Sequence, residues 1–389
     1  MKNQIVLKKN EEHRIAGGHL WIFSNEIASL RGNPESGSVV ELLRADEKFL
    51  GVGFFNPHSL IAFRLLSTNR EEISAAFFEK RIRRADTLRQ KFAPESAAYR
   101  MVYGESDFLP GLIIDRYNEY LSLQILSAGM ESHLDIICSV LEDMFHPKAI
   151  VARNDVGARA LENLPQEKKI LRGTVEKTII TEDDVKFSVD VFNGQKTGFF
   201  LDQRENRKFI RRYCAGAHVL DCFCNEGGFS MHAAKGGAKM ITALDSSDAA
   251  IAHAATNAHL NQVEKISFLT GDAFDFLQKF DTQNDHFDVV ILDPPSFTKS
   301  KKTIATALKG YKEIHTRAFG LINKGGFLMT ASCSHHVMEE AFLDVIQQSA
   351  LKRGRRIQLL EFHGAGPDHP IHPAMPETRY LKFAIFSVL

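Results

Sequence analysis

The sequence predicts a multidomain α/β protein: a small β domain, a central α+β domain, then a parallel sheet with helices on both faces. The length of 389 residues exceeds the roughly 250–300 residues at which a single hydrophobic core stops growing. Short apolar segments punctuated by glycine fill the first part of the chain, and apolar segments alternate with helical stretches from Val189 onward. That alternation is typical of parallel strands connected by helices.

Residues 1–70 are expected to form a small β-barrel or sandwich. Short apolar segments in this part are separated by glycine and polar residues, and such spacing is typical of small β domains. The segments cover 38–43, 50–55 and 60–66. A helical pattern begins at about residue 70, which places the end of the domain there.

A stretch at 13–23 mixes basic and aromatic side chains and contains the only tryptophan of the chain, Trp21. Two interpretations stay open. Trp21 and Phe23 can be core residues of a small domain. Alternatively, this stretch contacts RNA, with His13, Arg14 and His19 as the contacting side chains.

Residues 71–185 are expected to form the central α+β domain. Its first element is predicted to be a helix over 70–90, because apolar residues recur at helical spacing. The basic cluster 80–84 on this helix is either a solvated face or a surface that meets phosphates. Two strands around a turn and a second helix are expected to follow, at 108–117, 120–126 and 130–144.

Residues 186–389 are expected to form the parallel-sheet domain. The predicted strands cover 219–220, 240–244, 266–269, 289–292 and 327–330. In an open α/β sheet, ligands bind outside the carboxyl ends of the strands. The residues that follow each strand are therefore the first candidates for a functional site.

A glycine pair, Gly227-Gly228, lies where the first of these strands turns into a helix. Glycine at such a turn lets the backbone approach a ligand closely and directs helix N–H groups toward negative charge. The turn does not match the dinucleotide pattern G-x-G-x-x-G, which disfavours a nicotinamide cofactor. A different nucleotide-type cofactor is expected.

Acidic residues follow four successive strands. They are Asp221, Asp245, Asp272 and Asp293. Each alone is a common helix-capping residue, but four at successive strand ends favour a cofactor site. An acid after the second strand commonly receives ribose hydroxyls, which suits Asp245, and Asp272 can meet an adenine amino group.

Cys333 follows the fifth predicted strand, in Ser332-Cys333-Ser334. It is either a small buried hydrophobe, as free cysteines often are, or a nucleophile. Asp293 ends a neighbouring strand, so the same edge of the sheet would carry a carboxylate and a thiol. This pairing suggests chemistry on a nucleic-acid base.

Composition limits the partners. The 48 Lys and Arg balance 48 Asp and Glu, so RNA binding must depend on local patches. Five scattered cysteines argue against a disulfide framework and fit a reducing cytosol, and Cys222 and Cys224 are too close for the usual zinc pairings. No signal peptide and no stretch of ~20 apolar residues are recognised. A cytoplasmic protein without a metal or a membrane partner is expected.

Over nearly its full length the chain resembles the RNA cytosine-C5 methyltransferases of the large-subunit ribosomal RNA methyltransferase I type. The resemblance rests on 18–23, 107–112, 195–204, Gly227-Gly228, Asp293-Pro294-Pro295 and Ser332-Cys333-Ser334. It implies an N-terminal PUA domain, a central domain and a Rossmann-like methyltransferase domain that uses S-adenosyl-L-methionine. It also implies an RNA substrate, expected to be 23S ribosomal RNA, and leaves a homodimer open.

The resemblance implies a set of residues around the cofactor. These are Lys196, Thr197, Gly198, Phe200, Asp202, Asp221, Phe223, Gly227, Asp245, Asp272 and Asp293. It places Cys333 on the catalytic cysteine of the family. One departure is that many RNA cytosine-C5 enzymes carry a second cysteine after the fourth motif, where this chain has Pro295-Ser296. The residue that assists release of the enzyme is therefore unassigned.

The implied chemistry gives each remaining candidate a role. A Cys333 thiolate adds to C6 of cytosine and makes C5 nucleophilic, while Asp293 hydrogen-bonds or protonates N3. Phe297 stacks on an unpaired base or packs its own loop. Basic residues are expected to contact RNA or to lie on a solvated loop, and they are Lys299, Lys301 and Lys302.

Two other functions stay open. The sequence Asp-Pro-Pro-Ser-Phe at 293–297 also resembles the element of amino-methyltransferases, which methylate an exocyclic base nitrogen and need no cysteine. The second alternative is a non-catalytic RNA-binding factor of ribosome assembly. The four acids together with Cys333 argue against that alternative, because a binding module has no use for them.

Overall fold

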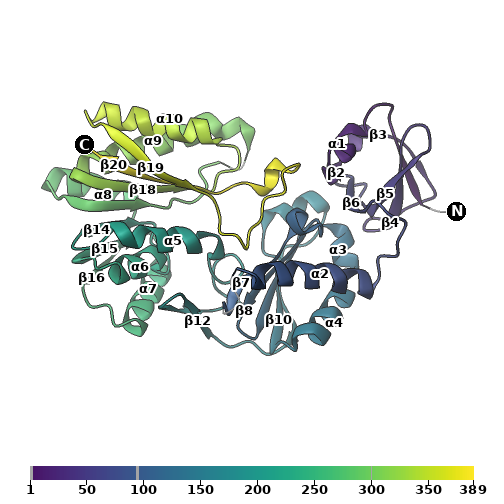
Figure 1. The fold of residues 1–389 in the computed structure, drawn as a ribbon, viewed down its shortest axis with the longest axis horizontal. Coiled ribbons are helices and arrows are strands. Elements are labelled where there is room, and N and C mark those ends of the chain that lie inside the picture. Colours follow the sequence, from purple (N-terminus) through teal and green to yellow (C-terminus); the bar gives the residue numbers. More distant parts are fainter. Residues whose placement is uncertain (1–2, 93–95, 299) are drawn as a thin grey trace. The chain divides into compact units, whose positions relative to one another are not determined.

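A computed structural model describes residues 3–92, 96–298 and 300–389 of the chain. The chain divides into two compact units (Figure 1). Unit 1 consists of Met1–Ile180, Val189–Leu201 and Pro367–Thr378. Unit 2 consists of Thr181–Ser188, Asp202–Gly366 and Arg379–Leu389. The strands β12 (Thr178–Glu182) and β13 (Val185–Val189) lie where the chain passes from one unit to the other.

Unit 1 begins with the expected small β domain. Its six-stranded sheet has the order β2-β6-β5-β4-β1-β3. The strands are β1 (Gln4–Leu7), β2 (Trp21–Ile22), β3 (Ile27–Arg31), β4 (Val39–Leu43), β5 (Phe49–Phe55) and β6 (Phe63–Ser67), with α1 (His13–Ala16) and the 3-10 helix η1 (Ser24–Glu26). Alternate strand residues such as Ile5, Leu42 and Phe63 form the core, as expected for a sheet with one buried face.

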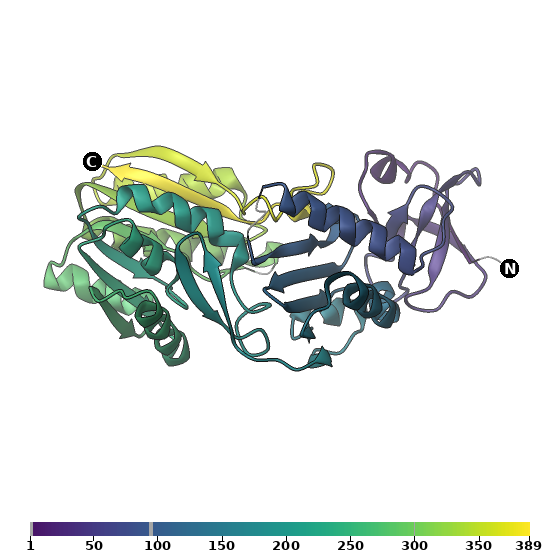
Figure 2. The ribbon, with the colours of Figure 1, turned by 60° about the horizontal axis from the view of Figure 1, so that its bottom comes forward.

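Unit 1 continues with a five-stranded sheet in the order β11-β10-β9-β8-β7. The strands are β7 (Ala98–Tyr103), β8 (Leu112–Tyr117), β9 (Tyr120–Ile125), β10 (Ala149–Arg153) and β11 (Lys168–Gly173). The helices are α2 (Ala75–Gln90), α3 (Ala128–Ser132) and α4 (Leu134–Phe145), with 3-10 helices η2 (Gly104–Asp107) and η3 (Gly157–Glu162). Figure 2 shows α2 lying along this sheet, where Phe77 and Ile82 join the core.

Two helix predictions differ from the structure at their ends. The helix expected from residue 70 begins at Ala75, because Ser74 is extended (φ −107°, ψ 179°). The single helix expected over 130–144 is divided into α3 and α4. His133 leaves helical geometry there (φ −109°, ψ 9°), and its ring Nδ1 lies 2.7 Å from the Gly129 carbonyl.

Unit 2 contains the expected parallel sheet, in the order β16-β15-β14-β17-β18-β20-β19. The strands are β14 (His218–Cys222), β15 (Met240–Asp245), β16 (Ile266–Thr270), β17 (Phe287–Leu292), β18 (Ile322–Ser332), β19 (Ile357–His363) and β20 (Lys382–Val388). The strands from β16 to β18 are parallel, whereas β20 runs antiparallel to both β18 and β19. The strand order reverses direction between β14 and β17, the position where open α/β sheets bind ligands.

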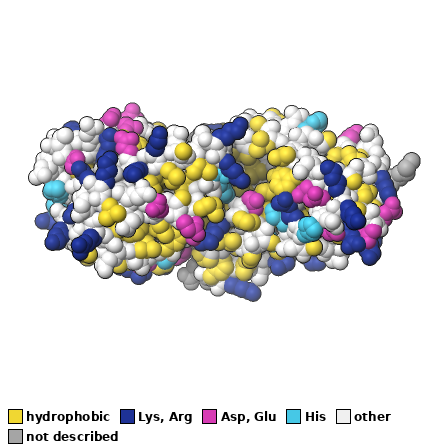
Figure 3. Space-filling model, turned by 90° about the horizontal axis from the view of Figure 1, so that it is seen from above, with side chains coloured by type: hydrophobic (Ala, Val, Ile, Leu, Met, Phe, Trp, Pro, Cys, Tyr) yellow, Lys and Arg dark blue, Asp and Glu magenta, His cyan; other side chains and the backbone are white. Residues whose placement is uncertain are grey.

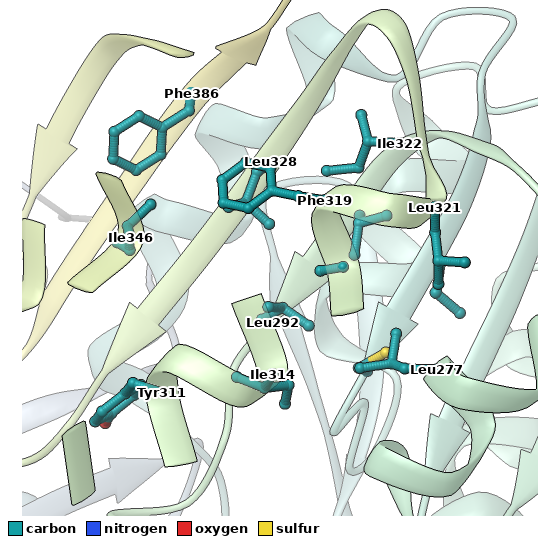
Figure 4. Packing of buried hydrophobic residues seen from close by; sticks show 14 of the residues in the cluster. Leu277, Leu292, Tyr311, Ile314, Phe319, Leu321, Ile322, Leu328, Ile346 and Phe386 are labelled. Atoms are coloured by element: carbon teal, nitrogen blue, oxygen red, sulfur yellow. The ribbon is translucent and has the colours of Figure 1, made fainter. Parts of the chain in front are cut away.

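Helices cover both faces of this sheet (Figure 1). They are α5 (Arg204–Ile210), α6 (Gly228–Lys235), α7 (Asp248–Leu260), α8 (Ala273–Gln283), α9 (Ile304–Leu321) and α10 (Glu339–Lys352). Unit 2 also contains the 3-10 helices η5 (Arg211–Tyr213) and η6 (Lys301–Thr303), whereas η4 (Leu201–Gln203) lies at the unit boundary and η7 (Pro376–Thr378) belongs to unit 1. Figure 4 shows a core on one side of the sheet, where Phe319 of α9 packs on Leu328 of β18. Ile210 and Phe229 belong to a separate core, so the sheet is buried on both faces.

Within the described ranges, the helices are all too short or too polar to cross a lipid bilayer.

Candidate active site

Five candidate residues lie at the carboxyl ends of five neighbouring parallel strands. In the spatial order of the sheet they are Asp272 after β16, Asp245 in β15, Asp221 in β14, Asp293 after β17 and Cys333 after β18. Parallel strands end at a common edge, so the structure brings the four acids and the thiol to one edge of unit 2. This is the arrangement that the sequence predicted.

The loop after β14 has an unusual backbone. Phe223, Asn225 and Gly227 all have positive φ, of 64°, 46° and 77°. For Phe223 and Asn225 this conformation is energetically costly, and such residues cluster at functional sites. An added Cβ at Gly227 would lie 3.2 Å from Cβ of Ala254, a tight contact that requires a small shift of the neighbour.

Asp221 is fully buried. The Ser230 hydroxyl donates to its Oδ2 at 2.6 Å, whereas Oδ1 has no hydrogen-bond partner among the described residues. Burial raises the pKa of Asp221 to about 7, and the charges of Asp293 and Asp245 act in the same direction. A cationic ligand group at Oδ1 would satisfy this carboxylate and favour its ionised form.

Asp245 holds the loop after β14 against β15. Its Oδ2 accepts the backbone N–H of Asn225 at 2.9 Å, and its Oδ1 accepts that of Ser247 at 3.0 Å. An ionised carboxylate has about four acceptor positions, so Asp245 retains capacity for ligand hydroxyls.

Asp272 is the N-cap of α8. Its Oδ1 accepts the backbone N–H groups of Phe274 at 2.8 Å and Asp275 at 3.3 Å. The capping role weighed for these acids is therefore present at Asp272. Its contact with an adenine group stays a prediction.

Asp293 is oriented by a residue that the sequence reasoning did not single out. Gln203 donates from Nε2 to Asp293 Oδ2 at 3.0 Å, and Asn206 donates to Gln203 Oε1 at 2.7 Å. Gln203 and Asn206 are themselves buried. The only signal in the sequence was that Gln203 falls within the 195–204 motif.

Cys333 differs from the other four cysteines of the chain, because they are buried and it is partly exposed. Burial raises the pKa of Cys138 to about 11 and that of Cys214 to about 12. Burial also raises the pKa values of Cys222 and Cys224. Cys333 is therefore the cysteine that a substrate can reach.

A buried lysine lies beside Cys333. Lys382 opens β20 opposite Ser332 and is only 5% exposed. Its ammonium donates to the carbonyls of Ser334 and Tyr380, both at 2.9 Å. Burial lowers the pKa of Lys382 to about 8, and the negative charge of an ionised Cys333 opposes that shift. The same attraction acts in both directions, so the positive charge of Lys382 stabilises the thiolate form of Cys333.

A hydroxyl network surrounds the Cys333 backbone. Tyr311 of α9 donates to Ser332 Oγ at 2.8 Å and lies 3.2 Å from Ser334 Oγ. Ser296, in the loop after β17, lies 3.1 Å from the same Ser334 oxygen. The network therefore links the two strand ends that carry Asp293 and Cys333. Burial raises the pKa of Tyr311 to about 12, so it stays a donor.

The predicted RNA-contacting residues of unit 2 differ in exposure. The Phe297 ring is partly buried and packs edge-on against Tyr311, with centroids 4.7 Å apart, as the loop-packing interpretation expected. Lys301 and Lys302 are exposed in η6. Lys299 lies outside the described residues.

Four predicted cofactor residues lie in unit 1: Lys196, Thr197, Gly198 and Phe200. Thr197 donates to the buried Asp115 at 2.5 Å and lies 3.2 Å from the Tyr117 hydroxyl. The Lys196 ammonium lies 4.1 Å from the Phe200 ring centroid. This segment is therefore anchored within unit 1.

Asp202, the remaining predicted cofactor residue of the 195–204 motif, belongs to unit 2. It is buried and accepts the Tyr380 hydroxyl at 2.5 Å. Tyr380 is also the residue whose carbonyl accepts from Lys382. Asp202 is thus connected to the surroundings of Cys333 through one tyrosine.

Arg14 and His19, the candidates of the small β domain, differ in their surroundings. Arg14 pairs with Glu26 at 3.0 Å and keeps 41% of its side chain exposed. His19 is 7% exposed, and its Nδ1 accepts the Trp21 backbone N–H at 3.0 Å. Arg14 is therefore open to a partner, whereas His19 mainly supports the fold. RNA contact by either residue stays a prediction.

Two family profiles match the chain, one for PUA-like domains over residues 5–68 and one for S-adenosylmethionine-dependent methyltransferases over residues 166–373. A ribosomal RNA large subunit methyltransferase I from Tolumonas auensis is 38% identical over 390 residues, which cover 98% of each chain. One from Aeromonas hydrophila is 39% identical with the same coverage. The chain belongs to the ribosomal RNA large subunit methyltransferase I family. The predicted PUA-like and methyltransferase domains are thereby confirmed.

Solved structures agree with this fold. A protein assigned as a SAM-dependent methyltransferase from Streptococcus mutans covers 100% of both chains with a TM-score of 0.85 at 21% identity. A methyltransferase complexed with SAH does so with a TM-score of 0.86 at 20% identity. The fold is therefore shared over the whole chain.

As a member of this family, the chain uses S-adenosylmethionine as its methyl donor. The strand-end residues fit that cofactor. Its amino-acid part carries an α-ammonium, and Asp221 Oδ1 is a buried acceptor that no described residue supplies with a donor. Its ribose carries hydroxyls, and Asp245 retains acceptor capacity. Gly227 has no side chain, so the loop that follows Asp221 leaves space for the cofactor at this position.

Proposed function

We propose that this protein methylates C5 of a cytosine in the ribosomal RNA of the large subunit. The observation that carries the proposal is the position of Cys333, a partly exposed thiol at the end of the strand next to the one that Asp293 follows. An amino-methyltransferase would not need a thiol there. The names of the two relatives above support the RNA substrate.

The chemistry of cytosine explains why a thiol is required. C5 is too weakly nucleophilic to accept a methyl group unaided. Addition of the Cys333 thiolate to C6 breaks the C5–C6 double bond and makes C5 the nucleophilic carbon of an enamine. When bound, S-adenosylmethionine would supply an electrophilic methyl group to C5, with the neutral thioether S-adenosylhomocysteine as the leaving group. A base then removes the C5 proton, and breaking of the C6–S bond restores the aromatic ring and the thiolate.

The surroundings of Cys333 support its ionised form. The thiolate, and not the thiol, is the nucleophile. Lys382 brings a buried positive charge to the same strand end, and that charge is fixed by the carbonyls of Ser334 and Tyr380. Lys382 is thus a positioning and electrostatic residue for the reaction.

Asp293 is proposed to contact the N3 edge of cytosine, where negative charge develops as C6 is attacked. Gln203 donates to one of its oxygens and so fixes the orientation of the carboxyl group. Phe297, Lys301, Lys302 and Arg14 are proposed to contact RNA.

The remaining assignments are part of the same proposal. We assign residues 1–70 to RNA binding, 71–185 to the central domain and 186–389 to methyl transfer. We propose that the protein acts in the cytoplasm, because its proposed substrate is ribosomal RNA.

Analysis of the methylated nucleoside tests the proposal. Large-subunit ribosomal RNA from cells that lack this protein would be incubated with the pure enzyme and labelled cofactor, digested, and separated by liquid chromatography with mass detection. The proposal expects the label in 5-methylcytidine. Label in a nucleoside methylated on an exocyclic nitrogen would favour the amino-methyltransferase alternative, and absence of label would favour a binding factor.

A further inference from the structure

The outer face of α2 carries a row of cations. Charge is balanced over the whole chain, and on the face shown in Figure 3 Lys and Arg are interspersed with Asp and Glu. Lys80 and Arg84 of α2 and its C-cap residue Lys91 are exposed and follow one another at i, i+4 and i+11. At 3.6 residues per turn these positions share one face and span about 16 Å.

This face borders a cavity of about 510 Å³. Its wall includes these three cations together with Arg81 and Arg83, and residues of the turn after β7, including Ser106 and Phe108. Arg83 is paired with Glu79 at 2.7 Å. All of these residues belong to unit 1. We call Lys80, Arg84, Lys91, Ser106 and Phe108 the α2 groove.

The cations of the α2 groove are not neutralised by the protein. Among the residues that the structure describes, no ion pair involves Lys80, Arg84 or Lys91. Asp107 also borders the cavity, but both of its oxygens accept from the buried Arg89, at 2.6 and 2.7 Å. The one carboxylate on the described wall is therefore already compensated, and the groove is electropositive.

The turn that carries Phe108 is held rigidly against α2. Arg81 donates to the Phe108 carbonyl at 2.9 Å and to the Leu66 carbonyl at 2.6 Å. Phe108 has a left-handed backbone, with φ of 60°. The guanidinium of Arg84 lies 5.6 Å from the centroid of the Phe108 ring. The groove thus pairs a fixed aromatic ring with a guanidinium plane.

A row of unpaired cations beside an aromatic ring is the combination that binds single-stranded nucleic acid. Cations follow the phosphates, and rings or guanidinium planes stack on bases. The Ser106 hydroxyl beside the wall is buried and has no partner among the described residues. An acidic peptide would use the cations but would have no need of the ring.

We infer that the α2 groove binds the sugar–phosphate backbone of an unpaired RNA segment, with a base against Phe108. The inference rests on the proposed function, because it assigns the groove to the same RNA. It adds a contact surface in the central domain to those expected in the PUA-like domain and beside Cys333.

The test compares two triple variants of the full-length protein. The first is Lys80→Ala with Arg84→Ala and Lys91→Ala. The matched control removes three exposed cations from unit 2, as Lys265→Ala with Lys324→Ala and Lys352→Ala. RNA dissociation constants would be measured across a salt series with an unstructured ribosomal RNA fragment, and cofactor affinity by calorimetry.

The groove variant is expected to bind RNA roughly tenfold more weakly at about 0.1 M salt. Its slope of log affinity against log salt should fall by about 2, because each lost phosphate contact contributes about 0.7. Cofactor affinity should stay unchanged, and the control should retain both the affinity and the slope. Phe108→Leu should weaken binding without changing the slope.

The outcomes separate this inference from the proposed function. Unchanged RNA affinity and slope in the groove variant, with methylation of RNA by the unaltered protein, would overturn the inference alone. An equal loss in the control would also overturn it, since it would show a general charge effect. Loss of RNA binding confined to the groove variant, in a protein that methylates no RNA, would support the groove and contradict the proposed function.

Discussion

The ammonium of Lys382 donates to the carbonyl of Ser334, the residue directly after Cys333, at a distance of 2.9 Å. Lys382 is nearly fully buried, so its charge acts in surroundings where screening by water is weak. The strand β20, which Lys382 opens, runs antiparallel to β18. The cation and the thiol therefore meet at the same edge of the sheet although 49 positions separate them in the sequence.

Removing this charge should make Cys333 less reactive. We expect Lys382→Met to slow alkylation of Cys333 by iodoacetamide at pH 7 by roughly tenfold, since a charge beside a partly buried group is worth about 1–2 kcal/mol. The effect should shrink as pH rises through about 8, where Lys382 itself loses its proton. Lys382→Arg, which keeps the charge, should alkylate faster than Lys382→Met. Identical alkylation rates in the Met variant and the unaltered protein would exclude the electrostatic role.

Cofactor affinity should depend on the ionisation of Asp221. Its pKa is raised to about 7 by burial, so below that pH the carboxyl is neutral and cannot pair with an ammonium. We expect the affinity for S-adenosylmethionine to fall as pH decreases from 8 to 6. Asp221→Asn should bind roughly 10–100-fold more weakly at pH 8, the cost of a hydrogen bond to a charged group.

Calorimetry between pH 6 and 8 measures both effects. Asp221→Asn should also lose most of the pH dependence, because the titrating group has been removed. Asp272→Asn serves as the control. Asparagine keeps a side-chain oxygen that can still cap α8, so this variant should keep the pH dependence. A cofactor affinity that is equal at pH 6 and pH 8 would contradict the pairing of Asp221 with the cofactor.

Gly227 should be required for two separate reasons. Gly227→Ala is expected to destabilise the protein by about 1–3 kcal/mol, because an L side chain is strained at φ of 77° and its Cβ would lie close to Ala254. Gly216 also has positive φ, of 72°, but an added Cβ there meets no atom within 4 Å. Gly216→Ala therefore measures backbone strain without the contact.

Chemical denaturation should show a larger loss for Gly227→Ala than for Gly216→Ala. Cofactor affinity should fall only in the Gly227 variant, since Gly216 lies at the opposite end of β14. Equal losses of stability in the two variants would show that the approach to Ala254 carries no cost.

The strand ends could be predicted from the sequence because their signals are local. Asp221, Asp245 and Asp293 directly follow apolar runs, and the carboxyl ends of parallel strands lie at one edge of the sheet. The positions of Asp221, Asp245, Asp293 and Cys333 in the fold required nothing more. The same local reasoning gave the body of α2 but not its start, since the backbone of Ser74 is extended and the helix begins at Ala75.

Long-range pairs could not be predicted in this way. Lys382 and Gln203 are ordinary polar residues in the sequence. They come near Cys333 and Asp293 only because the fold places β20 and η4 beside those strand ends. Likewise, Met375 belongs to the core of the small β domain, and its sulfur accepts the Leu20 backbone N–H at 3.3 Å. No periodicity links residues 355 positions apart.

The central claim is that Cys333 forms a covalent bond to C6 of cytosine during turnover. The most direct measurement is trapping with RNA that carries 5-fluorocytosine in the presence of S-adenosylmethionine. Fluorine cannot leave C5 as a proton does, so elimination stalls and the thioether persists. We expect a stable protein–RNA adduct whose peptide map places the bond on Cys333.

Cys333→Ala should form no adduct and transfer no methyl group while binding the cofactor normally, and Cys333→Ser should be essentially inactive because a hydroxyl is far less ionised near neutral pH. Cys214→Ala, which removes a buried thiol, should trap as the unaltered protein does. A Cys333→Ala enzyme that still methylates RNA, without an adduct in the unaltered protein, would contradict the account.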